Sequence, residues 1–124
     1  MHAPSILFMG TPDFAVPSLQ ILVENRLPLV GIVTQPDRPS GRGRHFTPPP
    51  VKVLAEAHHL PIFQPERIRD ESFLKIFREL SPELVVVVAF GQILPGEMLT
   101  RPRFGCVNVH PSLLPKYRGA APIQ

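Results

Sequence analysis

Five short runs of apolar residues alternate along the chain with longer segments of mixed polarity. Most of these runs are rich in β-branched residues and end near Gly, Pro or Asp, which is typical of buried strands in a parallel sheet. The clearest is Leu84–Ala89, because a run that is apolar on both faces suits a central strand covered by helices on both sides. The five predicted strands are Ser5–Met9, Leu29–Thr34, Pro61–Gln64, Leu84–Ala89 and Gly105–His110.

The segments between these runs carry apolar residues at near-helical spacing, with Thr11 or Asp13 available to cap the first helix. Pro36–Pro50 is too polar and too interrupted to form an element and is predicted as a long loop, and Pro95–Leu99 is predicted as a short turn. The three predicted helices are Asp13–Glu24, Val51–His59 and Glu71–Leu80. The order βαβαβαββ therefore predicts an α/β fold with an open, mostly parallel, doubly wound, Rossmann-like sheet.

Composition narrows the class of protein. The 124 residues are 44% hydrophobic, which suits one globular domain, and a net charge of +3 is too small to indicate nucleic-acid binding by itself. The single cysteine, Cys106, excludes an intramolecular disulfide and is predicted to be a buried thiol in a reducing compartment. No apolar stretch approaches the ~20 residues of a membrane span, so we expect a soluble, cytoplasmic protein.

Candidate chemistry lies where the predicted strands end. In open α/β sheets the ligand binds beyond the carboxyl ends of the strands, where the strand order reverses. If the Ser5–Met9 and Leu84–Ala89 strands flank that point, three loops converge there: Gly10–Asp13, Phe90–Ile93 and the segment from His110 onward.

Two polar residues stand out among these loops. Asn108 and His110 are two positions apart at the end of a strand and so project from the same face. A neutral His can move a proton near pH 7 and an Asn amide can donate to a developing oxyanion, which together suit acyl transfer between amines. The alternative is that both side chains only form hydrogen bonds to backbone groups of the loops. Their positions in the sequence favour neither this alternative nor the catalytic role.

Several other chemistries lack their motifs. No Gly-x-Ser-x-Gly elbow is present, and Cys106 is predicted on an interior strand, out of phase with His110, so direct transfer without a covalent enzyme intermediate is favoured. The absence of Gly-x-Gly-x-x-Gly and Walker motifs argues against nicotinamide enzymes and P-loop NTPases. His58 and His59 are adjacent on a predicted helix and diverge, most simply toward solvent, so no metal site is predicted.

The predicted loop also carries a local concentration of positive charge. Its segment from Gln35 to His45 contains Arg38, Arg42 and Arg44 together with flexible Gly residues, a composition suited to contacts with phosphates. The segment could thus hold a nucleic-acid substrate near the carboxyl edge of the sheet. The alternative is a solvated mobile loop.

The segment Asn108-Val109-His110-Pro111-Ser112-Leu113-Leu114-Pro115 resembles the Asn-x-His…Ser-Leu-Leu-Pro motif of the folate-dependent formyltransferases. The motif implies 10-formyltetrahydrofolate as the formyl donor, while members of the family differ in the amine that accepts the group. Three further segments resemble the branch that formylates methionyl-initiator tRNA in translation initiation, and the resemblance covers essentially the whole chain. They are Met9–Ala15, Thr34–Pro39 with Gly41–Gly43, and Arg118–Gln124.

This resemblance implies roles for particular residues. Asn108 and His110 correspond to two of three catalytic polar residues, and Val88–Leu94 lines the pterin pocket. The residues expected to bind the folate are Phe90, Gly91, Ile93, Ser112, Leu113, Leu114 and Pro115, and those expected on the tRNA acceptor stem are Arg38, Arg42 and Arg44. A nucleotide sugar and glycinamide ribonucleotide are the alternative acceptors within the family.

The resemblance also implies the extent of the domain. Residues 1–124 correspond to the N-terminal, incomplete part of a formyltransferase catalytic domain, without the third catalytic residue, an Asp, and without a C-terminal tRNA-binding domain. We therefore expect little or no formyl transfer by these residues alone, and self-association through an exposed last strand, whereas the full-length form is expected to be a monomer. Two rivals remain open: a non-catalytic folate- or RNA-binding module, and a nucleotide-binding Rossmann protein.

Overall fold

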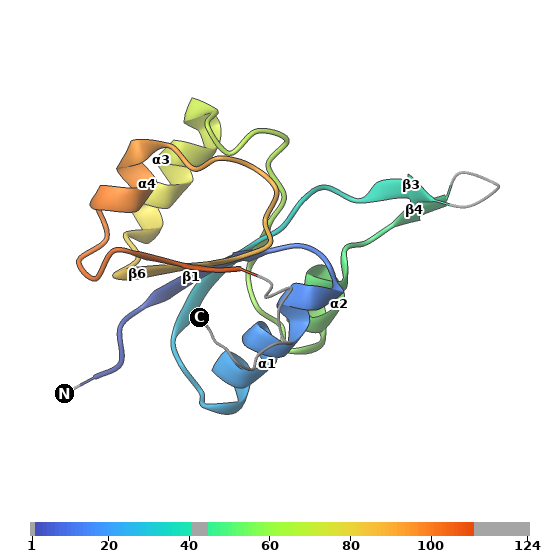
Figure 1. The fold of residues 1–124 in the computed structure, drawn as a ribbon, viewed down its shortest axis with the longest axis horizontal. Coiled ribbons are helices and arrows are strands. Elements are labelled where there is room, and N and C mark those ends of the chain that lie inside the picture. The colour runs from blue at the N-terminus through green and yellow to red at the C-terminus, as the bar shows by residue number, and fades with distance from the viewer. Residues whose placement is uncertain (1, 41–44, 111–124) are drawn as a thin grey trace, which may run out of the picture.

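The computed structural model describes residues 2–40 and 45–110 and shows a five-stranded parallel sheet with helices on both faces (Figure 1). The order across the sheet is β5-β2-β1-β6-β7, and every neighbouring pair is parallel. The strands are β1 (Ile6–Gly10), β2 (Leu29–Val33), β5 (Ile62–Phe63), β6 (Leu84–Val88) and β7 (Cys106–Val109). The predicted α/β, doubly wound fold class is confirmed, and all five predicted strands are present with slightly different ends.

Helices cover the sheet in two pairs. A 3-10 turn, η1 (Asp13–Ala15), leads into α1 (Val16–Glu24), which lies with α2 (Pro50–Ala57) on one face. On the opposite face lie α3 (Glu71–Leu80) and α4 (Gly96–Thr100) (Figure 1).

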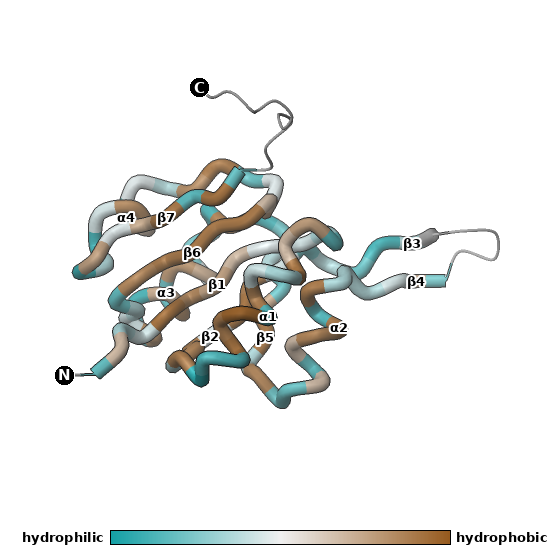
Figure 2. The backbone as a smooth tube through the Cα atoms, turned by 60° about the horizontal axis from the view of Figure 1, so that its bottom comes forward, coloured by the Kyte–Doolittle hydropathy of each residue, from teal (hydrophilic) through white to brown (hydrophobic). Residues whose placement is uncertain are grey.

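Alternation along the strands divides the core between these two faces. Leu7 and Met9 of β1 belong to the core cluster under α3 and α4, whereas Phe8 belongs to the cluster under α1 and α2. Neighbouring residues of a strand point to opposite faces, so one strand contributes to both clusters. The tube through the backbone is accordingly largely hydrophobic along β1 and β6 (Figure 2).

The helix α3 shows how the sequence pattern produces this packing. Phe73 and Phe77 are four residues apart, so both face the sheet, and both are buried. Burial of a side chain of this size contributes about 1.5–3 kcal/mol. The helix ends at Ser81, which adopts a left-handed conformation with φ 46°. The bounds of α3 are those predicted from the sequence.

The strand order reverses between β1 and β6. From β1 the chain crosses by α1 to β2 and then by α2 to β5, moving one way across the sheet, before α3 carries it back to β6 on the other side of β1. Residues of β1 pair directly with those of β6, from Ile6 with Leu84 to Gly10 with Val88. The predicted switch point is therefore confirmed, and β6 is an interior strand, although β1 holds the middle position.

Two predictions of irregular structure are wrong. Within Pro36–Pro50, the strands β3 (Arg38–Ser40) and β4 (His45–Thr47) form an antiparallel hairpin that projects away from the sheet (Figure 1). Its pairing satisfies backbone groups with little burial of side chains, so it leaves no hydrophobic pattern in the sequence. Pro95–Leu99 was predicted as a turn but contains most of α4, which is too short to show a helical period.

Helix ends also differ from the predictions. Neither Thr11 nor Asp13 provides a side-chain cap for η1 or α1. The helix α2 ends at Ala57, so His58 and His59 follow it rather than belonging to it, and both are exposed. Among the described residues, no helix is long and apolar enough to cross a membrane.

Candidate functional site

Three loops are tied together at the carboxyl ends of β1, β2 and β6. The backbone N–H of Gln35 donates to Thr11 Oγ1 at 3.3 Å, and the Thr11 hydroxyl donates to the Phe90 carbonyl oxygen at 3.4 Å. The Gln35 side-chain amide donates to the same carbonyl oxygen at 3.0 Å. The ends of β1 and β6 approach each other so closely that a glycine is needed, because a Cβ at Gly10 would lie 2.8 Å from the Val88 carbonyl oxygen.

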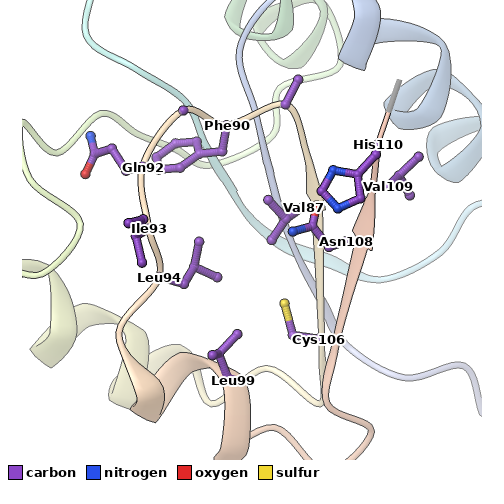
Figure 3. Close-up of a pocket in the computed structure, with 12 residues that line it drawn as sticks. Val87, Phe90, Gln92, Ile93, Leu94, Leu99, Cys106, Asn108, Val109 and His110 are labelled. Atoms are coloured by element: carbon purple, nitrogen blue, oxygen red, sulfur yellow. The ribbon is translucent and has the colours of Figure 1, made fainter. Parts of the chain in front are cut away.

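A cavity of about 500 Å³ opens at the ends of β6 and β7, and we call it the β6–β7 cavity (Figure 3). One side is formed by the segment that follows β6 and by Leu99 of α4, and the other by β7. Its lining comprises Val87, Ala89, Phe90, Gly91, Gln92, Ile93, Leu94, Leu99, Cys106, Asn108, Val109 and His110. The predicted folate residues Phe90, Gly91 and Ile93 are thus brought around one cavity with the predicted catalytic pair.

Asn108 and His110 lie next to each other along the cavity face of the last strand and the residue after it (Figure 3). Asn108 pairs in register with Val87 of β6, and both polar residues are exposed. Within residues 2–40 and 45–110, neither side chain makes a hydrogen bond, so nothing in this part of the chain supports the alternative that they satisfy loop backbone groups. Among the described residues, both side chains therefore face the cavity without a partner.

Cys106 also faces this cavity, and the prediction that it lies out of phase with His110 is wrong. Residues 106, 108 and 110 are successive even positions on one strand face, and Figure 3 shows their side chains along the same side. Within the described residues β7 is an edge strand paired only with β6, and the thiol is half-buried rather than buried. Burial raises the pKa of the Cys106 thiol, which disfavours the thiolate, and this now argues against a nucleophilic role.

The helix α4 is joined to α3 by an ion pair. Arg78 of α3 donates from Nε to Glu97 Oε2 at 2.6 Å and also pairs with Glu71. The hydrogen bond from Arg78 holds the pKa of the Glu97 carboxyl below its usual range. Leu99, two residues after Glu97 in the same helix, lines the cavity.

A second cavity, of about 580 Å³, lies between the sheet and the β3–β4 hairpin, and we call it the hairpin cavity. It shares Ala89, Phe90 and Gly91 with the β6–β7 cavity, and we call these three residues the shared wall. The other residues of its lining are Thr11, Pro12, Gln35, Pro36, Arg38, Thr47 and Pro49. Arg38, predicted to contact phosphates, therefore lies at a cavity that adjoins the one lined by Asn108 and His110, the predicted catalytic pair.

The base of the hairpin is fixed by Asp37. Its carboxylate accepts hydrogen bonds from Gln64 Nε2 at 2.7 Å and from Lys52 Nζ at 3.0 and 3.2 Å. The bond from Gln64, followed by that from Lys52, holds the pKa of the Asp37 carboxyl below its ordinary value. The hairpin is thus joined to α2 and to the segment after β5 by polar contacts.

Some predicted site residues lie outside the described residues, and the structure adds residues at the site that were not predicted. Ser112, Leu113, Leu114, Pro115, Arg42 and Arg44 belong to the first group. Gln35, which lines the hairpin cavity, belongs to the second, although it follows a strand at the predicted ligand edge, a position that could have indicated it. Among the described residues, no group of three or more His, Cys, Asp or Glu is arranged to hold a metal ion.

Two cavities that meet at the switch point of a parallel sheet define a ligand-binding α/β domain of the doubly wound class. Residues 5–124 match the formyl transferase family, and the chain belongs to that family.

Relatives of known name are similar over almost the whole chain. The methionyl-tRNA formyltransferase of Syntrophus aciditrophicus is 60% identical over 120 residues, which is 97% of this chain and 38% of that protein. The proteins of the same name from Pelobacter propionicus and Geobacter metallireducens are each 59% identical over the full chain and are covered to 39% and 40% of their length. The chain thus spans about two fifths of the length of the curated relatives it matches.

Solved structures agree on the fold. The phosphoribosylglycinamide formyltransferase of Anaplasma phagocytophilum superposes with a TM-score of 0.60 at 19% identity, covering 97% of this chain and 55% of that one. The enzyme of the same name from Coxiella burnetii has a TM-score of 0.58 at 16% identity, with 97% and 56% covered.

Proposed function

We propose that the protein transfers the formyl group of 10-formyltetrahydrofolate to the amino group of methionyl-initiator tRNA, in the cytoplasm. The observation that carries this proposal is the pairing of Asn108 and His110 on the wall of the β6–β7 cavity, next to a second cavity that bears Arg38. The acceptor is supported by the names of the relatives, which are methionyl-tRNA formyltransferases at 59–60% identity.

The folate donor occupies the β6–β7 cavity in this proposal. Ile93 and Leu94 offer apolar surface to the pterin, and backbone groups from Val88 to Leu94 offer hydrogen bonds to its edge. Ser112, Leu113, Leu114 and Pro115 complete this site, as the sequence motif implies. The acceptor approaches from the hairpin cavity, where Arg38, with Arg42 and Arg44, contacts the phosphates of the tRNA acceptor stem.

The reaction then follows from the two polar side chains. The methionyl nitrogen attacks the formyl carbon, and the new oxyanion accepts a hydrogen bond from the Asn108 side-chain amide. His110 takes the proton that the attacking nitrogen loses and passes it to N10 of the folate as the bond between carbon and N10 breaks. The step forms one C–N bond and breaks another without a change of oxidation state, so it requires no redox cofactor.

A formylation assay with the complete protein tests this proposal. The donor is 10-formyltetrahydrofolate, and the acceptors are methionyl-initiator tRNA, uncharged tRNA, glycinamide ribonucleotide and a nucleotide amino sugar. We expect formyl-methionine only with the charged tRNA. Formyl transfer to one of the small amines instead would keep the chemistry and overturn the acceptor, and no transfer to any amine, with ligand binding retained, would support a non-catalytic binding module.

Alkylation of Cys106 tests the position of the donor separately. Because the thiol lines the β6–β7 cavity, bound tetrahydrofolate should slow its reaction with N-ethylmaleimide at least several-fold, as measured by mass spectrometry of the Cys106 peptide. The raised pKa predicts that the unprotected reaction accelerates steadily as the pH rises above neutrality. Equal rates with and without the folate would place the donor elsewhere, and protection by NAD or ATP instead would favour a nucleotide-binding protein.

A further inference from the structure

The shared wall is held in an unusual backbone conformation. Ala89 has φ 53° and Gly91 has φ 98°, so two of its three residues are left-handed. A residue with a Cβ adopts this conformation only where its surroundings hold it there, and such positions cluster at ligand sites. The wall therefore depends on the contacts that fix it, and any change in those contacts is felt in both cavities.

Among the described residues, two side chains donate hydrogen bonds to this wall, those of Thr11 and Gln35, and Gln35 also packs against it. Its side-chain amide donates to the Phe90 carbonyl oxygen at 3.0 Å, and its side-chain oxygen accepts from Gln92 Nε2 at 3.2 Å. A Cβ placed on Gly91 would lie 3.1 Å from Gln35 Nε2, which shows how closely this side chain packs against the wall. The Gln92 side-chain oxygen in turn accepts a hydrogen bond from the Ile68 backbone N–H at 2.7 Å, so the side chain that donates to Gln35 is itself held in place.

The same residue is joined to the hairpin on its other side. The Gln35 carbonyl oxygen accepts from Gln64 Nε2 at 3.1 Å, and that nitrogen also donates to Asp37 Oδ1 at 2.7 Å. Asp37 pairs with Lys52 and directly precedes Arg38 of β3. A continuous set of hydrogen bonds thus runs from the wall of the β6–β7 cavity, through Gln35 and Gln64, to the base of the hairpin.

From this arrangement we infer that Gln35 is a positioning residue that couples the two cavities, so that a folate in one and the aminoacyl end of a tRNA in the other bind more tightly together than alone. The inference rests on the proposed function. A ligand that orders the shared wall from one side has already met the entropic cost of ordering it. The ligand on the other side then binds with a more favourable free energy, and the effect is reciprocal. Gln35 acts through the wall and the hairpin and contacts no reacting atom in this scheme.

The experiment measures the affinity of tetrahydrofolate by isothermal titration calorimetry, with and without saturating methionyl-tRNA, in the complete protein. Tetrahydrofolate carries no formyl group, so both ligands can bind without reacting. We expect the tRNA to tighten tetrahydrofolate binding about fivefold or more in the wild type, a typical coupling factor. In Gln35→Met, which keeps the length of the side chain but cannot donate to Phe90, the factor should fall below about twofold.

Two further variants separate coupling from general damage. Gln64→Met breaks the link on the hairpin side and should also reduce the factor, while tetrahydrofolate binding without tRNA stays as in the wild type. Gln20→Met is the matched control, because within the described part of the chain the Gln20 side chain bonds only to Glu24 of the same helix, so the factor should stay unchanged. The ratio of affinities is the deciding measurement, because a merely structural role would change stability without changing it.

The outcomes are distinct. The inference is overturned if methionyl-tRNA does not tighten tetrahydrofolate binding in the wild type. It is also overturned if Gln64→Met and any folded Gln35→Met protein show the same tightening as the wild type. In either case the proposed function stands if methionyl-tRNA is still formylated. If Gln35→Met does not fold, Gln64→Met decides alone. Failure of the wild type to formylate methionyl-tRNA or to bind tetrahydrofolate would overturn the proposed function, and the inference with it.

Discussion

The β6–β7 cavity and the hairpin cavity lie on opposite sides of the shared wall, and they are held in place by different forces. Strand ends and α4 surround the first, and Met98 of α4 and Val87 of β6 belong to the buried core beneath it. The second depends on a hairpin whose described side chains are mostly exposed and whose base is fixed by Asp37. A cavity held by close packing suits chemistry that requires fixed distances, whereas one bounded by a polar hairpin suits a large, charged acceptor.

The proposed function assigns the chemistry to the β6–β7 cavity, and removing the side chain of Asn108 or His110 should have the largest effect. His110→Ala should lower kcat about 10²–10⁴-fold, because the attacking amine loses its proton acceptor. Asn108→Ala should lower kcat about 10²–10³-fold, because the oxyanion loses a donor. Steady-state formylation in the complete protein measures both, with binding of tetrahydrofolate retained.

The matched control for these variants is His58→Ala, which removes an exposed histidine beyond the end of α2. Its turnover should equal that of the wild type. An unchanged kcat in His110→Ala would move the chemistry out of this cavity.

Donor affinity is the second way to separate the cavities. Ile93 is 81% exposed and lines the β6–β7 cavity alone, so a bound pterin can cover it. Ile93→Ala should raise KM for 10-formyltetrahydrofolate roughly tenfold or more, from the lost burial of its side chain, and leave KM for methionyl-tRNA unchanged. Ile21→Ala, at an exposed position on α1, provides the matched control. Equal effects on both KM values would mean that the two ligands do not occupy separate cavities.

Acceptor affinity should respond to the hairpin. Arg38→Ala is expected to raise KM for methionyl-tRNA several-fold at low salt, with kcat nearly constant, because one phosphate contact is lost. The slope of log KM against log salt concentration should fall by about one. Arg69→Ala, at an exposed position just before α3, should leave the slope unchanged. The wild-type slope in Arg38→Ala would remove Arg38 from the tRNA contacts.

The smallest effect concerns the base of the hairpin and depends on pH. The pKa of Asp37 is lower in the folded protein than its ordinary value of 3.8, so the unfolded chain binds the proton more readily. The stabilisation is therefore complete well above pH 3.8 and is lost as the pH falls through the lowered pKa. Urea unfolding of the wild type and Asp37→Asn should show a stability difference at pH 7 that shrinks below pH 3.8. A difference independent of pH would mean that the charge of Asp37 does not stabilise the hairpin.

The elements that the sequence predicted well are those that bury a face. In Glu71–Leu80, Phe73 and Phe77 face the sheet, and Leu84–Val88 is apolar on both sides. The spacing of the buried apolar residues is therefore enough to identify each element in the sequence. The β3–β4 hairpin and α4 were missed for the opposite reason. The hairpin is stabilised mainly by backbone pairing and polar contacts, and α4 is only five residues long, so neither produces a readable period.

The sequence by itself determined the α/β class, the switch point between β1 and β6, the family and the pairing of Asn108 with His110, because each depends on local pattern, motif or spacing. Only the tertiary structure decided that Cys106 shares the face of that pair, that two cavities meet at Ala89–Gly91, and that Gln35 links them. The links from Gln35 join residues 29 and 55 positions apart in the sequence. Contacts over such separations are set by how the strands are ordered and how the loops meet, which no local pattern of residues records.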